Sequence, residues 1–450
     1  MSSDAREFDV AVVGAGVAGL AAASALAEAG QRVLVLEARG LPGGRATAFA
    51  DRETGELVDN GQHALFGCYY QTFAFLRRIG AEANVRAQPS LEIPFLGPAG
   101  ERSLLKCPAG PSPLHLLIGV LRWEALSWPQ RLRVFRLASP LLQARARLAR
   151  GEPETVQGTV AEWLTRYGQT GRLREWLWEP LAIAALNQSP EEAAASSFVR
   201  VLAFMFGTDP AAASIVLPVV PLHEMYAAPA RRYIEARGGE VRMNALARIR
   251  IEQGRVARIE VRGEAIRVSR AVAAVPWFAL ASLLEGDTAS MAGTMAAASA
   301  MASKPIVTVN LWYDRPVMED LFVGLPGREM QWVFDKRQAF GERASHLSLV
   351  ASGAEALVGS DTAALVALAR REVAAAIPGA RDAVLRHGTV IREKRATFSL
   401  APGQPARPGV VTPVQGLVLA GDWIETGLPG TIESAAIAGH LAAAAIQNPK

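Results

Sequence analysis

The sequence predicts a mixed α/β protein (in part α+β). Near the N-terminus, an apolar strand at residues 9–13 leads directly into a glycine-rich turn and an alanine-rich helix at residues 20–29. Near the C-terminus, a second buried strand at residues 416–420 leads through another glycine-rich turn into a helix that runs to about residue 446. The chain has 450 residues, half of them apolar and a fifth charged. This composition is typical of a globular protein of two or three domains.

The N-terminal turn is a Gly14-x-Gly16-x-x-Gly19 motif, and the strand that follows the helix, at residues 32–36, ends in Glu37. Gly14 permits the tight turn, Gly16 lets a pyrophosphate approach the backbone, and Gly19 lets the helix pack closely on the strand. The helix N-terminus offers free N–H groups to phosphates. Glu37 is placed to accept hydrogen bonds from a ribose diol. The context predicts a Rossmann-like dinucleotide site; the alternative is an ordinary strand–turn–helix connection.

Two further segments favour FAD over NAD. Gly43 and Gly44 allow a close approach of the backbone, and the adjacent Arg45 can reach a pyrophosphate. In the C-terminal strand–turn–helix segment, Asp422 is placed to bind a ribityl hydroxyl. The alternative is that Asp422 is a solvated acid at the end of a strand. Thr431 is expected to be the N-cap of the last helix, whose N-terminus would face the flavin ring.

Residues 10–27 are uncharged and long enough to suggest a membrane-spanning helix. The glycine motif within them contradicts that interpretation. The first nine residues mix acidic and basic side chains, unlike the start of a signal peptide. Pro276 breaks the longest other apolar stretch, at residues 271–284. We therefore expect no spanning helix.

Charge and cysteine content exclude several classes of protein. The net charge is only +4 and nearly all the cations are arginines, with no basic and aromatic cassette, so we expect no nucleic-acid partner. Cys68 and Cys107 are too few for a disulfide-rich secreted scaffold and too far apart for a redox pair, which indicates a reducing compartment. No histidine pair has metal-ligand spacing, so no metal site is expected.

Together these motifs resemble the FAD-dependent superfamily of amine oxidases and phytoene-type desaturases. The resemblance implies non-covalent FAD and a discontinuous FAD-binding domain interleaved with a substrate domain. On that basis the FAD-binding domain comprises residues 1–90, 223–286 and 387–450. The substrate domain comprises a helical, membrane-facing region at residues 91–222 and a second part at residues 287–386.

The residues assigned to FAD come from every segment of that domain. The resemblance places the adenine near Ala247, just before a strand. The full set is Gly14, Gly16, Val17, Ala18, Gly19, Glu37, Ala38, Arg39, Gly43, Gly44, Arg45, Gly61, Gln62, His63, Ala247, Gly421, Asp422, Thr431 and Ile432.

A narrower resemblance rests on four segments. Residues 59–69 contain Gly-Gln-His, an apolar run, a glycine and a tyrosine; residues 72–80, 311–316 and 421–435 continue the match. These segments resemble the bacterial hydroxysqualene dehydroxylases. The resemblance implies reduction of hydroxysqualene to squalene, with loss of water and oxidation of FADH2. It also implies a long-chain isoprenoid substrate; the external electron donor is unknown.

The catalytic candidates are His63 and Gln62, as polar groups near the flavin. A second interpretation of His63 is that it braces its loop through a backbone hydrogen bond. Glu433, two residues after the expected N-cap, is similarly expected either to act near the flavin or to favour a helix N-terminus.

Three rival functions remain. A carotenoid desaturase of the same fold also needs FAD and an apolar tunnel. An amine oxidase is disfavoured because the position at which its relatives commonly carry a lysine is Thr308, and Lys304 is too far along the strand. A non-enzymatic prenyl carrier would not need the flavin contacts.

Residues 113–150 combine leucine and tryptophan with an excess of arginine. One interpretation is an interfacial helix on anionic lipid, in which Trp123 and Trp128 face the bilayer; the other is a core-packed helix with a basic outer face. An isoprenoid substrate favours the first, which predicts a cytoplasmic protein at the inner face of the cell membrane. Seven apolar residues could line a tunnel or pack in a core: Trp163, Trp176, Trp178, Phe198, Phe204, Met205 and Phe206.

The remaining segments show clear periodicity. Strands are expected at residues 248–252 and 255–261, joined by a Gln253-Gly254 turn. Apolar strands are expected at residues 305–313, 330–334 and 345–351. Helices are expected at residues 225–236 and 362–377.

Overall fold

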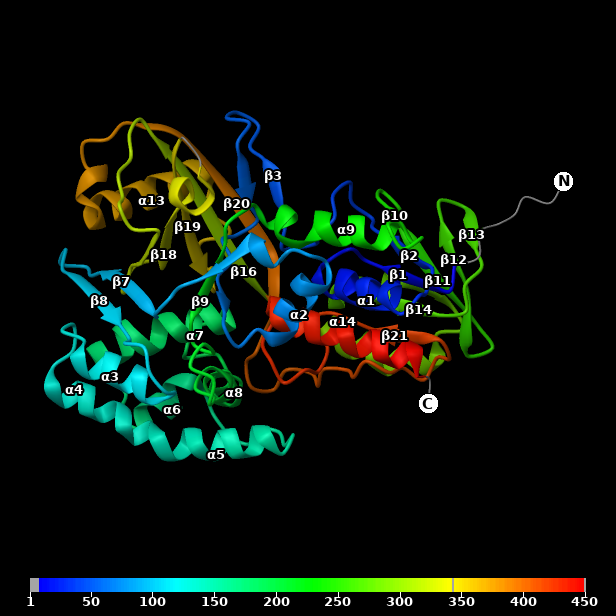
Figure 1. Cartoon of the computed structure of the whole chain (residues 1–450), viewed down its shortest axis with the longest axis horizontal. Helices are drawn as coiled ribbons and strands as arrows, with labels where there is room; N and C mark the ends of the chain where they lie inside the picture. Colours follow the sequence, from blue (N-terminus) through cyan, green and yellow to red (C-terminus); the bar gives the residue numbers. More distant parts are fainter. Residues whose placement is uncertain (1–7, 342–343, 449–450) are drawn as a thin grey trace.

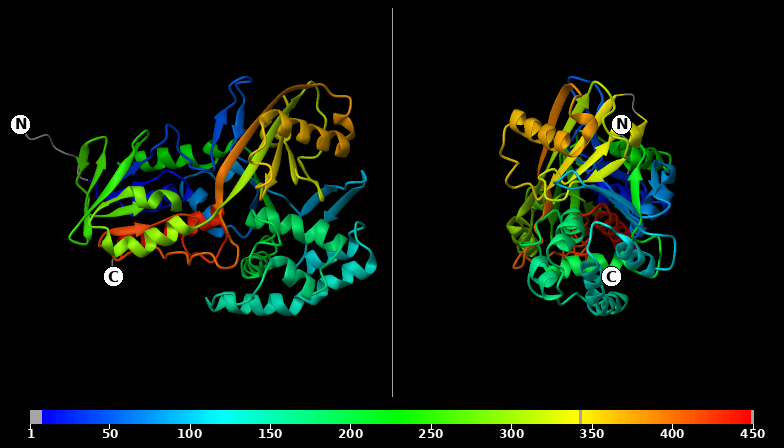
Figure 2. Two further views of the ribbon diagram at one scale, coloured as in Figure 1. Left: turned by 180° about the vertical axis from the view of Figure 1, so that it is seen from behind. Right: turned by 90° about the vertical axis from the view of Figure 1, so that its left-hand side faces the viewer.

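The computed structural model describes residues 8–341 and 344–448. It is elongated, with two lobes (Figure 1). One lobe holds the N-terminal strand–turn–helix and the C-terminal helix side by side. The other has a mixed sheet above a group of helices, and the view from behind shows the same division (Figure 2).

The first lobe is built on a five-stranded parallel sheet in the order β10-β2-β1-β14-β21. β1 and β2 are entirely buried, because helices pack on one face of the sheet and a smaller sheet packs on the other. The strands are β1 (Val10–Val13), β2 (Val33–Leu36), β10 (Glu240–Arg242), β14 (Ala271–Ala273) and β21 (Leu417–Leu419). Segments far apart in the chain therefore form one sheet.

Three helices cover one face of this sheet: α1 (Val17–Glu28), α9 (Ala228–Glu235) and α14 (Ile432–Gln447). α1 and α14 can approach closely because Gly439 has no side chain. A Cβ at this position would lie only 2.4 Å from the carbonyl oxygen of Ala18. Thr431 is the N-cap of α14 and its hydroxyl accepts from the Ser434 N–H at 3.1 Å. The expected last helix and its cap are thus confirmed.

A smaller sheet packs at the far end of this lobe, in the order β13-β12-β11-β15. Its strands are β11 (Ala247–Glu252), β12 (Arg255–Val261), β13 (Glu264–Ile266) and β15 (Leu284–Gly286). Gln253 and Gly254 both have positive φ, 53° and 72°, which is the geometry of a type I′ hairpin turn. The predicted hairpin is confirmed.

The second lobe contains a seven-stranded sheet in the order β20-β16-β19-β18-β17-β7-β8. Its strands are β7 (Glu92–Leu96), β8 (Arg102–Lys106), β16 (Ser303–Tyr313), β17 (Phe322–Gly324), β18 (Trp332–Asp335), β19 (Ser345–Ser352) and β20 (Leu385–Phe398). α13 (Thr362–Ala376) packs on β16 and β20. The predicted strands at residues 305–313, 330–334 and 345–351 and the helix at residues 362–377 are confirmed, within a few residues at their ends.

Two parts of the predicted organisation differ from the structure. Residues 91–222 are not uniformly helical, because β7 and β8 form a hairpin that extends the seven-stranded sheet. β20 lies almost wholly beyond residue 386, yet it pairs with β16 in the sheet of the second lobe rather than with any strand of the first. The hairpin joins the sheet through the pairing of β7 with β17, and β20 joins it through β16; neither long-range pairing has a local sequence signal.

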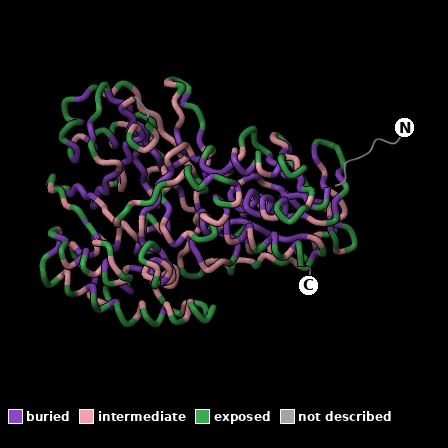
Figure 3. The backbone as a smooth tube through the Cα atoms, in the orientation of Figure 1, coloured by how far each residue is buried: buried purple, intermediate pink, exposed green. Residues whose placement is uncertain are grey.

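Helices α3 to α8 form the helical part of the second lobe, which we call the helical lobe. They are α3 (Leu114–Arg122), α4 (Trp128–Arg133), α5 (Ala138–Ala149), α6 (Val160–Arg166), α7 (Glu179–Leu186) and α8 (Ala195–Met205). Its core includes Trp163, Trp176, Trp178, Phe198 and Met205, all buried. Phe204 and Phe206 are only partly buried against that core. The tube in Figure 3 shows long exposed stretches along α5, on the outer edge, and almost none along α1.

The remaining helices and strands are short. They are β3 (Ala48–Ala50), β4 (Leu57–Asp59), β5 (Leu65–Phe66), α2 (Tyr70–Arg78), β6 (Val85–Ala87), β9 (Ile215–Pro218), α10 (Leu280–Leu283), α11 (Ala292–Ala300) and α12 (Lys336–Phe340). Within the described ranges, no helix is both long and apolar enough to cross a membrane.

Candidate active site

A groove of about 430 Å³ lies along the carboxyl ends of β1, β2, β14 and β21. This is the edge at which parallel α/β sheets bind nucleotides. Every residue that the sequence assigned to FAD lines this groove except Gly19, Gly61 and Gln62. Gly61 and Gln62 instead line an adjoining chamber. The structure thus brings together residues up to about four hundred positions apart.

The glycine loop has no room for side chains. Gly14 has φ +107°, and a Cβ there would lie 2.3 Å from the carbonyl oxygen of Ala274. A Cβ on Gly19 would lie 1.9 Å from the carbonyl oxygen of Gly14, so Gly19 allows close helix packing rather than contact with a ligand. Gly44 faces Gly16 across the groove, where a Cβ would stand 3.2 Å from the Gly16 Cα. Bare backbone next to the α1 N-terminus is the cradle that a pyrophosphate needs.

Glu37 is buried and faces the groove. Its two carboxylate oxygens accept hydrogen bonds from the backbone N–H groups of Ala15, at 2.8 Å, and Arg39, at 2.9 Å. Each oxygen keeps a further lone pair for a ribose hydroxyl. Glu37 therefore also braces the glycine loop, a contribution that the sequence motif does not indicate.

Arg45 and Asp422 form an ion pair of 2.5 Å at the end of the groove that meets the chamber. The Arg45 guanidinium also donates to the carbonyl oxygen of Ala396 at 2.6 Å and lies 5.4 Å from the centre of the Trp277 ring. Sequence reasoning treated the two as separate contacts, to the pyrophosphate and to the ribityl chain. The hydrogen bond from Arg45 to Ala396 joins the first lobe to the end of β20.

The chamber, of about 180 Å³, adjoins both the groove and a third, apolar cavity. It shares Arg45, His63 and Thr431 with the groove. It shares Gln62, Ala64, Tyr69, Ala184, Val350 and Ser352 with the apolar cavity. A ligand in the apolar cavity could therefore present one of its atoms to a flavin in the groove.

The apolar cavity has a volume of about 350 Å³. Its lining comes from the helical lobe, the seven-stranded sheet and β9, and is almost entirely aliphatic and aromatic. The polar side chains in its lining are those of Gln62, Tyr69, Arg145 and Ser352. Cys107 and the tryptophan rings add only a thiol and indole N–H groups. At the outer end, Phe135 and Leu142 line the cavity and are also exposed on the surface. The cavity thus runs from the outside of the helical lobe to the chamber.

His63 lines both the groove and the chamber. Its Nδ1 lies 2.8 Å from the carbonyl oxygen of Gly61. Because a carbonyl only accepts, Nδ1 carries the proton. Burial lowers the pKa of His63 below its usual 6.5, so the ring is neutral near pH 7 and its Nε2 can accept a hydrogen bond but not donate one. The loop-bracing bond is therefore present, and a neutral His63 is not a proton donor.

Glu433 does not face the groove. Its carboxylate accepts hydrogen bonds from the backbone N–H groups of Gln71 and Thr72 and from the Thr72 hydroxyl, at 2.7–2.9 Å. Glu433 thus favours the N-terminus of a helix, as expected, but the helix is α2 and not its own. Burial raises the pKa of Glu433, and these three hydrogen bonds oppose that shift.

Sequence reasoning missed Lys336 and Tyr69. The Lys336 ammonium is buried and donates to Asp59 at 2.6 Å and to Gln62 at 2.8 Å. Nothing near Lys336 in the sequence marks it, since its partners are more than 270 positions away. Tyr69 was quoted only as part of a motif; burial raises the pKa of its phenol, which therefore stays neutral at physiological pH.

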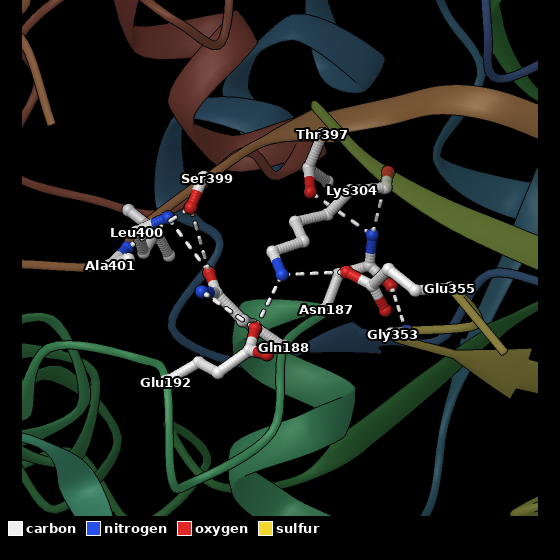
Figure 4. Close-up of polar contacts among 10 residues, drawn as sticks. All are labelled: Asn187, Gln188, Glu192, Lys304, Gly353, Glu355, Thr397, Ser399, Leu400 and Ala401. Carbon is white, nitrogen blue, oxygen red and sulfur yellow. Dashed lines mark hydrogen bonds and ion pairs between the residues drawn. The ribbon is translucent and has the colours of Figure 1, made fainter. Parts of the chain in front are cut away.

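Thr308 lines the chamber, and Lys304 lies outside it. Figure 4 shows the Lys304 ammonium between Glu192, at 2.5 Å, and Glu355, at 2.6 Å. Beside it, the amide of Asn187 donates to the Thr397 hydroxyl at 3.0 Å and accepts from the Gly353 N–H at 2.8 Å. These bonds tie the end of α7 to β19 and β20, so Lys304 belongs to the joint between the helical lobe and the sheet.

Comparisons with known proteins agree with this geometry. Residues 17–447 match the family described as flavin containing amine oxidoreductase. The chain is 32% identical to a hydroxysqualene dehydroxylase of Rhodopseudomonas palustris, over 96% of this chain and 97% of that protein. It is 25% identical to a 15-cis-phytoene desaturase of Solanum lycopersicum, over 98% of this chain and 78% of that protein. Among solved structures, an oxidoreductase from Methanosarcina mazei superposes with a TM-score of 0.74 at 17% identity, over 96% of this chain and 99% of that one.

Proposed function

The chain belongs to the flavin containing amine oxidoreductase family, and from that premise we propose that it is a hydroxysqualene dehydroxylase. In this proposal it is an FAD-dependent oxidoreductase that reduces hydroxysqualene to squalene. The observation that carries the proposal is an apolar cavity that runs from the surface to a small polar chamber beside the flavin groove. Such a cavity fits a long isoprenoid with one reacting polar group.

The residues of the groove fit FAD. Glycines that leave no room for a Cβ face the pyrophosphate position, and the buried carboxylate of Glu37 faces the ribose position. The N-terminus of α14, capped by Thr431, lines the groove, where its partial positive charge would stabilise negative charge on a reduced flavin. Bound FADH2 supplies the hydride that replaces the hydroxyl, which leaves with a proton as water.

The protein's own contribution is to place one carbon of a long chain and to keep water away from it. The aliphatic walls exclude water, which strengthens every polar contact in the chamber. Gln62, Tyr69 and Ser352 are the polar residues that line both the cavity and the chamber. A substrate hydroxyl is thereby held at the one end of the cavity that faces the flavin.

The rival functions are less well supported. The relatives with the higher identities are hydroxysqualene dehydroxylases, and the phytoene desaturase has lower identity. Thr308 stands in the chamber where a lysine would favour an amine oxidase. A prenyl carrier without redox chemistry would have no use for the intact groove.

The proposed function includes a docking site on anionic membrane. The outer face of α3, α4, α5 and the turn between α4 and α5 exposes six large apolar side chains: Leu114, Ile118, Trp128, Leu132, Phe135 and Leu142. Arg122 and Arg136 are exposed among them, and the Arg131 guanidinium lies 4.8 Å from the centre of the Trp128 ring. Apolar side chains interspersed with arginine suit an interface with anionic lipid.

The apolar cavity opens within this face, since Phe135 and Leu142 belong to both. A substrate dissolved in the bilayer would enter without crossing water. We place the enzyme at the inner face of the cell membrane, on its cytoplasmic side. Of the two interpretations of residues 113–150, the core-packed one holds for Trp123, because that residue is 1% exposed and packs in the core of the helical lobe. Trp128, 64% exposed, is the residue that tests membrane contact.

An anaerobic single-turnover assay tests the reaction. The FAD-loaded protein is photoreduced, hydroxysqualene is added in detergent, and flavin absorbance and extracted products are followed together. The expected result is flavin reoxidation with one squalene formed per flavin. Absence of squalene, combined with new conjugation when oxidised enzyme is given phytoene, would replace the proposal with the desaturase function.

A further inference from the structure

We infer that Gln62 recognises the hydroxyl group of the substrate through its amide N–H, and that Lys336 is the positioning residue that aims this amide. The inference rests on the proposed function and names the contact that selects a hydroxylated isoprenoid. It depends on a contact between two segments that lie far apart in the sequence: the Gly-Gln-His loop and the first residue of α12.

Lys336 determines which end of the Gln62 amide faces the cavity. An ammonium group only donates hydrogen bonds. Its Nζ lies 2.8 Å from Gln62, which must therefore present Oε1 to it and turn Nε2 the other way. The assignment of oxygen and nitrogen, otherwise ambiguous for a glutamine, follows from the partner's chemistry.

Lys336 is itself held firmly. It is 1% exposed, its ammonium lies 2.6 Å from Asp59, and it stands 3.6 Å from the centre of the Phe340 ring. The second oxygen of Asp59 accepts from the Leu222 N–H at 3.0 Å. Lys336 therefore holds Gln62 against α12, and its partner Asp59 ties both to β4 and to the backbone at Leu222. Preorganised donors of this kind recognise a ligand without reordering when it binds.

Gln62 lies where the apolar cavity enters the chamber and lines both. Within residues 8–341 and 344–448, its Nε2 has no protein acceptor. A hydroxyl oxygen arriving along the aliphatic walls needs a donor there, because a buried polar group without a partner is costly. The nearby cation polarises the amide and makes it a better donor.

The first experiment compares two ligands that differ only by the hydroxyl. Hydroxysqualene and squalene are bound in detergent to the oxidised FAD enzyme, without reductant, and flavin fluorescence gives each dissociation constant. We expect the wild type to bind hydroxysqualene about tenfold more tightly than squalene, the preference that one buried hydrogen bond provides. Gln62→Met should reduce this preference to near one while squalene binding is kept.

Matched variants separate Gln62 from its neighbours. Tyr69→Phe and Ser352→Ala remove the other polar groups at the junction and should retain most of the preference, while Gln157→Met makes the same change on the surface. A Gln62→Met enzyme with the wild-type preference overturns the inference. So does loss of the preference in Tyr69→Phe with its retention in Gln62→Met.

The role of Lys336 is tested in the Asp59→Asn/Lys336→Met double variant, which removes both buried charges together. A positioning role predicts loss of the hydroxyl preference with FAD still bound, whereas general loosening would weaken both ligands alike and leave their ratio unchanged. A retained ratio overturns the role of Lys336. The Gln62→Met result stands independently, because it leaves the ion pair in place.

These outcomes are distinct from failure of the proposed function. If the reduced wild type forms no squalene from hydroxysqualene, and binds the two ligands equally, the proposed function and this inference fail together. If the wild type forms squalene and Gln62→Met keeps the preference, only the inference fails.

Discussion

The flavin groove and the apolar cavity are neighbours, but they are built in opposite ways. The groove is walled largely by backbone, with glycines facing each other across it and short motifs supplying its few side chains. The cavity is walled by large side chains from the helical lobe, the seven-stranded sheet and β9. A shared cofactor can be bound by a local backbone pattern, whereas a particular substrate requires side chains that only the tertiary fold assembles.

The largest expected effect is on the groove. Gly14→Ala would place a Cβ 2.3 Å from the carbonyl oxygen of Ala274 at a φ of +107°. Strain and overlap should destabilise the fold by more than about 3 kcal/mol and abolish FAD binding. Bound flavin and thermal unfolding measure both. Gly30→Ala is the control, since it also has positive φ but no atom within 4 Å of its Cβ; equal loss of FAD there would contradict this explanation.

A larger side chain in the cavity should impair the reaction and leave FAD bound. Ala184→Phe would fill the junction of cavity and chamber. We expect kcat/KM for hydroxysqualene to fall at least about 100-fold, as expected when the reacting atoms are misplaced. FAD content should be unchanged. Ala375→Phe, on the exposed face of α13, is the control. Loss of FAD in Ala184→Phe would show that the two regions are not separable.

A substitution of Glu37 tests how much a single side chain of the groove contributes to FAD binding. Glu37→Ala should weaken FAD binding by about 1–3 kcal/mol, because ribose hydroxyls lose their acceptor and the N–H groups of Ala15 and Arg39 lose theirs. Titration of the apoprotein with FAD gives the dissociation constant. Glu235→Ala, at an exposed position on α9, should leave it unchanged. An unchanged affinity in Glu37→Ala would remove Glu37 from the site.

Binding to vesicles tests whether the surface around the outer end of the cavity contacts a membrane. Trp128→Ser/Leu132→Ser should reduce sedimentation with anionic phospholipid vesicles about tenfold or more, since two exposed apolar side chains no longer enter the bilayer. Val411→Ser, at a 73% exposed apolar side chain of the other lobe, should have no effect. Equal vesicle binding by all three proteins would move membrane contact elsewhere.

The smallest expected effect concerns His63. Turnover should slow in His63→Ala while FAD stays bound, and a wild-type rate would leave only the loop-bracing role. Stability provides a second measurement. The unfolded chain takes up a proton near pH 6.5, whereas folded His63 does so only at lower pH. The wild type should therefore lose stability as the pH falls below about 6.5, and His63→Ala should lose less.

Much of the first lobe could be predicted because its signals are local. The glycine motif, the paired strand at residues 32–36, the hairpin at Gln253-Gly254 and the Thr431 cap all depend on neighbours within a few positions. Periodicity likewise located β16, β19 and α13. These features follow from backbone geometry and side-chain burial along one segment, which residue order alone specifies.

Only the tertiary structure decided which distant segments meet. It placed β7, β8 and β20 in one sheet, turned Trp123 into the core and left Trp128 outside. It used Glu433 to cap another helix and brought Lys336 to Gln62 across 274 positions. Such contacts are set by how lobes pack and by the need to pair every buried charge, and no short stretch of sequence contains that information.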